Sequence, residues 1–206
     1  MKIRATAAFL VCLLATAAAT AARADGNVET IGAFTGPASP SVQGVLQPSG
    51  YRVTLDGSVV AEVWLRKDAP GLVPSALVGV VTFPKDTSDF RGQAVKAGSY
   101  TMRYAQMPSD GNHLGAAPTT DFLLLSPLAD DTDAAAQPDS AALTKMSAKT
   151  VGLNHPAGLN LAAGGEPEKY PAVATNEDGH EVLHVKLETA KGGQPIALVV
   201  KGQTGH

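Results

Sequence analysis

YRVTLDGSVVAEVWLR, residues 51–66, carries the clearest structural signal in the sequence. Its two halves alternate apolar and polar residues with a period of two, which predicts strands that bury one face. Asp56 and Gly57 separate the halves, and this dipeptide readily adopts the positive φ angles of a tight hairpin turn. The sequence therefore predicts an antiparallel hairpin. The core face of this hairpin is predicted to consist of Tyr51, Val53, Leu55, Val59, Ala61, Val63 and Leu65.

Similar short apolar segments follow this hairpin, separated by turn signals every 8–15 residues. Further strands are predicted at residues 76–83, 97–107, 121–126, 158–162, 182–188 and 195–202. The one good helix candidate covers about 140–151, where Asp139 or Ser140 can cap the first turn and Gly152 can end the last. This pattern predicts an all-β fold, an antiparallel β-sandwich or jelly-roll-like domain with one inserted short helix.

The first 24 residues have the features of a secretory signal peptide. Lys2 and Arg4 form a positive start, residues 5–19 form an apolar run, and an A-x-A cleavage site ends at Ala24. We therefore expect residues 1–24 to be removed and the protein to be periplasmic or secreted. No later run of 18 or more apolar residues exists, so membrane insertion after removal of the leader is not expected.

The remainder of the chain divides into two parts. Residues 25–48 are rich in Gly, Pro and Ser, and we expect an irregular lead-in with a short edge strand around 42–46. Residues 49–206 are long enough to form a single β-rich domain with its own core. The only cysteine, Cys12, lies in the leader, so the mature chain contains no disulfide and no thiolate ligand.

The charge of the chain argues against several partners. Without its leader the chain has 13 basic and 19 acidic residues, a net charge of −6, and the basic residues are scattered. A nucleic-acid-binding protein requires a basic surface, and so does a protein that binds anionic membranes. We therefore expect neither partner, and we expect instead an unknown small molecule or a protein of the cell envelope.

The pentapeptide HEVLH, residues 180–184, matches the H-E-x-x-H motif of zinc proteases, with His180 and His184 as ligands and Glu181 as the base. The motif requires a helix, in which residues four apart lie about 5–6 Å apart at Cβ. On a strand the same residues are roughly 13 Å apart. Two histidines at that separation cannot share a zinc ion, because zinc–nitrogen bonds are only about 2.0–2.1 Å long.

The sequence around this motif favours a strand. Residues 178–179 are an Asp-Gly turn signal, and residues 182–188 alternate with a period of two. Apolar residues three and four apart leave a helix as the weaker alternative. A third zinc ligand is missing, since Leu187 and Ala190 occupy the places of Gly and His in the extended motif. We therefore expect an exposed strand face with two histidines, no metal site and no cofactor.

The segment 91–122 has the highest density of polar residues with functional potential, and it contains a loop between two predicted strands. Loops on a rigid β scaffold commonly hold binding residues. The loop is also rich in turn-forming residues, which is the simpler interpretation of its composition. Trp64 alternates away from the core face of its strand and is either exposed for stacking or, as we favour, covered by another element. The candidate ligand-binding residues are Arg91, Arg103, Tyr104, Asp110, His113 and Asp121.

Three segments resemble known proteins. They are VWLRKD (63–68), the segment 89–127 with its Ala-Gly-x-Tyr-Thr and Asp-Phe-Leu-Leu strands, and the closing segment 183–202. In this layout the chain resembles uncharacterised exported β-sandwich-like proteins of environmental bacteria, over most of residues 60–202. The resemblance implies export and a β architecture. That group has no known activity, so the resemblance implies no reaction and no site residues.

Together these observations favour an exported soluble β-sandwich protein that binds a ligand or a protein partner in the cell envelope, without enzymatic activity. The alternative is a periplasmic hydrolase in which His113 and Asp121 act as acid and base. A purely structural envelope protein is a third interpretation. A zinc protease that uses the H-E-x-x-H residues is disfavoured.

Overall fold

The computed structural model describes residues 26–108, 117, 119–163 and 165–202. Within these residues the chain forms twelve strands and two helices, and the named strands pair only in antiparallel fashion. Neither helix is long and apolar enough to cross a membrane. The predicted signal peptide, residues 1–24, lies outside the described part of the chain.

The larger sheet has seven strands. In spatial order they are β1 (Gly26–Ile31), β2 (Gly50–Leu55), β3 (Ser58–Leu65), β4 (Leu77–Phe83), β7 (Gly98–Gln106), β8 (Asp121–Pro127) and β9 (Ala157–Asn160). Spatial order follows chain order, since each strand of this sheet pairs with the sheet strand that comes next along the chain. Between β4 and β7 the chain leaves the sheet and forms a small hairpin of β5 (Thr87–Ser88) and β6 (Ala94–Val95).

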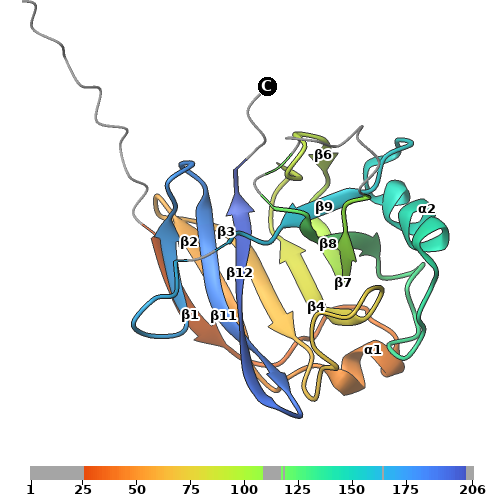
Figure 1. Cartoon of the computed structure of the whole chain (residues 1–206), viewed down its shortest axis with the longest axis horizontal. Coiled ribbons are helices and arrows are strands. Elements are labelled where there is room, and N and C mark those ends of the chain that lie inside the picture. Colours follow the sequence, from red (N-terminus) through yellow and green to blue (C-terminus); the bar gives the residue numbers. More distant parts are fainter. Residues whose placement is uncertain (1–25, 109–116, 118, 164, 203–206) are drawn as a thin grey trace, which may run out of the picture.

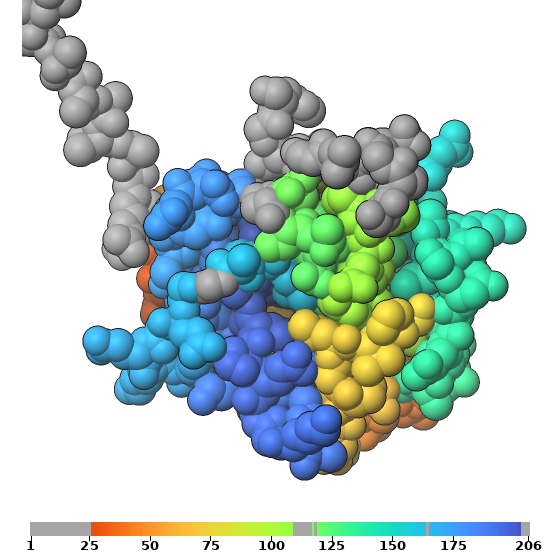
Figure 2. All heavy atoms as spheres, viewed as in Figure 1, coloured from red at the N-terminus to blue at the C-terminus, as the bar shows by residue number. Residues whose placement is uncertain are grey.

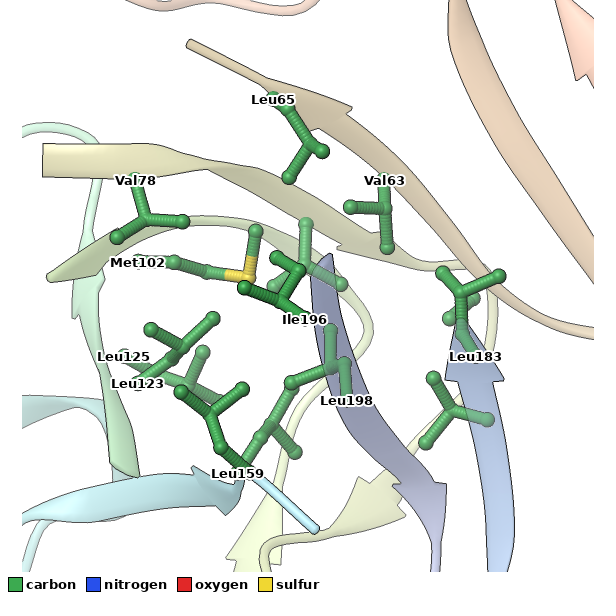
Figure 3. Close-up of a cluster of buried hydrophobic side chains, with 14 of the residues drawn as sticks. Val63, Leu65, Val78, Met102, Leu123, Leu125, Leu159, Leu183, Ile196 and Leu198 are labelled. Atoms are coloured by element: carbon green, nitrogen blue, oxygen red, sulfur yellow. The ribbon is translucent and has the colours of Figure 1, made fainter. Parts of the chain in front are cut away.

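The smaller sheet packs over the larger one. It consists of β10 (Ala172–Thr175), β11 (Glu181–Thr189) and β12 (Gly192–Lys201), and Figure 1 shows β11 and β12 in front of the larger sheet. Apolar side chains from both sheets form one shared core between them (Figure 3). This core includes Val63, Leu65, Val78, Met102, Leu123, Leu125, Leu159, Leu183, Ile196 and Leu198. The predicted all-β, sandwich-like fold is confirmed.

The two sheets also meet along both of their edges. Beyond β9, the backbone N–H of Ala162 donates to the carbonyl of Ala197 in β12 at 2.8 Å. On the opposite side β1 lies next to β10, where a Cβ on Gly26 would lie 2.8 Å from Cγ1 of Val173. These contacts cover edges that would otherwise leave unpaired backbone groups in solvent.

The predicted hairpin of residues 51–66 is confirmed as β2 and β3. Asp56 and Gly57 have φ angles of 49° and 72°, the left-handed conformations that a two-residue hairpin turn requires. One detail differs from the prediction. The register shifts by one residue at a β-bulge, so Val60 rather than Val59 packs against the core. A bulge of this kind changes which side chain faces inward without breaking the hairpin.

The predicted edge strand around 42–46 is wrong, because these residues belong to α1 (Pro40–Val45). Ser39 caps the helix, and its hydroxyl accepts a hydrogen bond from the backbone N–H of Val42 at 3.2 Å. Proline suits the first turn of a helix, where its missing N–H has no partner to lose. The same apolar residues that suggest a strand therefore pack on one side of a short helix.

The expectation of an irregular lead-in is also wrong for β1, which pairs with β2 along its whole length. Within β1 only Val28 and Ile31 are even partly buried, so the strand lacks the alternation that identifies a strand in sequence. The free backbone groups of the β2 edge provide the pairing instead. Its position as an edge strand explains why its side chains remain exposed.

Trp64 is covered, as predicted. It is 6% exposed and lies on the outer face of β3, below α1 and the segment that precedes it. Its indole N–H donates to the carbonyl of Gly32 at 2.8 Å, and its ring meets Phe34 edge to face at 5.1 Å. Gly50 makes room for the indole, since a Cβ there would lie 2.5 Å from the indole nitrogen. This tryptophan is therefore part of a second, smaller core.

The predicted helix is confirmed as α2 (Ser140–Val151). Asp139 accepts a hydrogen bond from the N–H of Ala142 at 2.8 Å, and Gly152 ends the helix with a φ of 66°. Two buried hydroxyls fix the helix to the sheet: Thr150 donates to Leu125 O, and Ser147 donates to Ala157 O, each at 2.9 Å. The helix therefore has a fixed position on the outer face of β8 and β9.

A buried ion pair on the outer face of β7 fixes the loop that leads to α2. Arg103 is 0% exposed, and its guanidinium binds both carboxylate oxygens of Asp131 at 2.7 and 2.8 Å. Its remaining N–H groups donate to the carbonyls of Ser75, Asp133 and Ala136, each at 2.7 Å. All five donors of the guanidinium are thus used within the protein.

We expect Asp131→Asn to lower the free energy of unfolding by about 3–5 kcal/mol, because it leaves the Arg103 charge buried without a counter-charge. Urea unfolding followed by circular dichroism measures the change. The matched control is Asp130→Asn, the neighbouring residue, whose ion pair with Lys149 is exposed. That substitution should cost less than about 1 kcal/mol. Equal effects at the two positions would contradict the assigned role of Arg103.

Candidate functional site

The described part of the chain contains four of the six predicted binding residues: Arg91, Arg103, Tyr104 and Asp121. Asp110 and His113 lie outside the described residues. Arg103 is fully buried and donates all of its N–H groups to protein acceptors, so it has no donor left for a ligand. We therefore leave it out of the candidate site.

Tyr104 and Asp121 contact each other, and the buried Tyr104 ring packs in the main core. The Tyr104 hydroxyl donates to Oδ1 of Asp121, and the side-chain amide of Gln106 donates to the same oxygen at 3.2 Å. Burial raises the pKa of Tyr104 to about 12, and the hydrogen bond to Asp121 adds to the rise. The tyrosine is therefore protonated at neutral pH and joins β7 to β8. The hydrolase alternative stays a prediction, because His113 is not described.

The H-E-x-x-H residues lie on a strand, as predicted. His180 directly precedes β11 and the next four residues begin it, and Leu183, Val185 and Leu187 then alternate into the main core. Among the described residues, no group of three or more histidines, cysteines, aspartates or glutamates could hold a metal ion. The geometry of β11 thus matches the argument against a zinc protease.

The expectation that the histidines lie on an exposed face is wrong, since His180, Glu181 and His184 are each less than 8% exposed. His180 meets the ring of Phe90 edge to face at 5.3 Å, and Glu181 accepts a hydrogen bond from Thr175 at 3.0 Å. Phe90 of the β5–β6 hairpin covers the start of β11 by packing against His180 and Val182, and the alternation of β11 cannot reveal this cover.

A pocket of about 710 Å³ lies on the outer face of the larger sheet, beside α2. We call it the α2 pocket. Its residues come from segments far apart in sequence: the loop before β4, the β5–β6 hairpin, β7, β8, α2 and the start of β9. Figure 1 shows α2 to the right of β8 and β6 above β9. The pocket therefore exists only in the folded protein.

The floor of the α2 pocket is apolar. Phe122 and Leu124 of β8 form its centre, with Leu143 of α2 and Phe90 of the β5–β6 hairpin at the sides. Phe90 and Phe122 meet edge to face at 6.1 Å. Gly158 in β9 keeps the floor open, because a Cβ there would lie 3.2 Å from Leu124 and 3.4 Å from Phe122.

The rim of the α2 pocket is polar. Arg91, Asn154 and His155 are exposed side chains on this rim, and Ser140 and Thr144 of α2 add two hydroxyls. Of the predicted binding residues that the structure describes, Arg91 and Tyr104 line this pocket; Arg91 is exposed and Tyr104 is buried. Sequence reasoning missed the contributions of α2, because nothing in the helix pattern indicates which surface it will cover.

A buried aspartate holds Arg91 in position. Asp89 is 0% exposed, and its carboxylate accepts hydrogen bonds from the backbone N–H groups of Arg91 at 3.0 Å and Gln93 at 2.8 Å. The N–H of Gly158 donates to the same carboxylate at 3.3 Å, and the N–H of Phe90 donates to the carbonyl of Gly158 at 2.9 Å. These bonds tie the hairpin directly to β9 in the pocket floor.

A second pocket, of about 500 Å³, lies between the loop of residues 69–73 and the turn that joins β11 to β12. Figure 2 shows this yellow loop beside the blue end of the small sheet. Glycines contribute much of its lining, and no aromatic side chain lines it among the described residues. This pocket offers fewer groups for recognition than the α2 pocket.

Comparisons with known proteins add no functional information. No protein-family model, no curated protein and no solved structure matches the chain.

Burial lowers the pKa of His184 from its ordinary value of 6.5. As the pH falls below 6.5, the unfolded chain binds a proton before the folded protein does, so the free energy of unfolding should fall until the folded pKa is passed. His184→Gln should remove this part of the pH dependence, as measured by urea unfolding between pH 7.5 and 5. His155→Gln, at an exposed position, is the control. An unchanged slope in His184→Gln would contradict the assignment.

Proposed function

We propose that the protein is an exported binding module that holds a small, largely apolar molecule in the α2 pocket. The pocket itself is the observation that carries this proposal. Its volume of about 710 Å³ lies within the range of roughly 300–1,000 Å³ that is typical of small-molecule sites. An apolar floor with a few polar groups at the rim is also the usual composition of such sites.

The rigidity of the pocket supports the same proposal. The floor belongs to β8 and β9, α2 is fixed by buried hydroxyls, and Asp89 fixes the hairpin on the other side. A site that already has its binding geometry loses little conformational freedom when a ligand enters. The walls of this pocket are therefore suited to specific binding.

A small molecule is favoured over a protein partner by the rest of the surface. Among the described residues, the only large hydrophobic side chains that are exposed are Val73 and Leu153. Protein-binding surfaces usually contain a larger apolar patch. The described surface has no such apolar patch, so an apolar ligand would instead contact the apolar floor of the α2 pocket.

The pocket should bind N-phenyl-1-naphthylamine, a neutral apolar dye whose fluorescence rises in an apolar site. Ala105 of β7 lines the pocket and has no side-chain hydrogen bond to lose, so Ala105→Phe should fill the space and weaken dye binding at least about tenfold. Fluorescence titration measures the change. Ala174→Phe, on a half-buried position of β10, is the matched control and should bind the dye normally. Equal binding by both variants would contradict the proposal.

Export is the second part of the proposal, and residues 1–24 carry it. When the full chain is expressed in a Gram-negative host, the protein released from the periplasm should begin at Asp25. Intact-mass measurement of the purified protein checks this. A cytoplasmic product that keeps residues 1–24 would contradict export.

A further inference from the structure

We infer that the ligand of the α2 pocket is an organic monocarboxylate, with its apolar body on the pocket floor and its carboxylate bound by Arg91. This inference rests on the proposed function and specifies the chemical class of the ligand.

The first observation is that, among the described residues, a single charged side chain lines the α2 pocket. Arg91 is the only residue with a full charge among the described residues that line it, and no aspartate or glutamate lines it there. The net charge of the whole chain is −3, so an arginine at an apolar pocket without a nearby acid is not a result of overall basic composition. A ligand with one negative charge would complement this single cation.

The second observation is that the Arg91 guanidinium has no partner among the described residues. Within the described part of the chain, its guanidinium makes no hydrogen bond and no ion pair, whereas each of the other arginines there is engaged. Arg52 binds Glu29 and Glu62, Arg66 donates to the carbonyl of Ala134, and Arg103 binds Asp131. The planar donor groups of Arg91 are thus free to bind a carboxylate through two parallel hydrogen bonds.

The third observation is that hydrogen bonds hold the backbone of Arg91 beside the pocket floor. Its backbone N–H is bound by the buried carboxylate of Asp89, and the adjacent Phe90 is bonded to Gly158 in the floor. The backbone of Arg91, from which its side chain extends, is therefore held next to the aromatic floor. A molecule with an apolar body on Phe90 and Phe122 would place an acid group at one end within reach of the rim, where Asn154 adds a neutral hydrogen-bond donor.

Isothermal titration calorimetry with 4-phenylbutyrate and 4-phenylbutyramide at neutral pH tests this inference. The two molecules have nearly the same shape, and only the first carries a charge. We expect the acid to bind at least about tenfold more tightly than the amide, because a charge-assisted bidentate hydrogen bond is lost in the amide. Added salt should weaken binding of the acid more than binding of the amide.

Arg91→Gln should remove the preference for the acid over the amide, and Arg91→Lys should restore part of the preference. The matched control is Lys201→Gln, which removes an exposed positive charge at the end of β12. It should leave the preference intact. Thermal unfolding should be the same for wild type and Arg91→Gln, since the guanidinium has no partner among the described residues.

The outcomes separate the two proposals. Equal binding of acid and amide, or a preference that persists in Arg91→Gln, would overturn the inference and leave the binding function in place. Dye binding without binding of either phenyl compound would also overturn the inference alone. Failure of the dye and of both phenyl compounds to bind would overturn the inference together with the proposed function.

Discussion

The buried pair of Arg103 and Asp131 is the interaction on which the functional part of this structure depends. A charged guanidinium without solvent is tolerated only when every donor has a partner, and this one has five bonds to the protein. Its acceptors lie in the loop around Ser75 and in the loop that leads into α2. Ser75 lines the α2 pocket, and the loop of residues 131–136 leads to Ser140 at the start of α2, which lines it too. The pair therefore joins the two segments that lead to these pocket residues. On the other side, Asp89 does the same for the β5–β6 hairpin with neutral backbone donors.

Much of the architecture follows from local patterns in the sequence. The hairpin of residues 51–66 could be predicted because alternation and a turn dipeptide agree, and each signal alone would be weaker. The same agreement separates strand from helix at residues 182–188. The helix α2 could be predicted because Asp139 and Gly152 mark both of its ends. These are features in which the local preference of the chain and the final fold coincide.

The remaining features depend on contacts between distant segments. Pairing with the edge of β2 makes β1 a strand, although its own side chains show no alternation. Arg103 looks like a binding residue in sequence because its partner, Asp131, lies 28 positions away in an acidic loop. His180 looks exposed in sequence because the Phe90 ring that packs against it comes from the distant hairpin of residues 87–95. Arg91 could be predicted as a candidate, but the apolar floor beneath it is formed only when α2 and β9 come together.

The central claim is that a rigid pocket beside α2 binds an organic anion. Two-dimensional ¹H–¹⁵N NMR of the mature protein during a titration with 4-phenylbutyrate tests it most directly, because each backbone amide reports its own surroundings. The account predicts shifts concentrated at Phe90, Arg91, Phe122 and Leu143, with little change elsewhere. Shifts confined to the second pocket, at residues 69–73 and 189–194, or no shifts at all, would contradict the account.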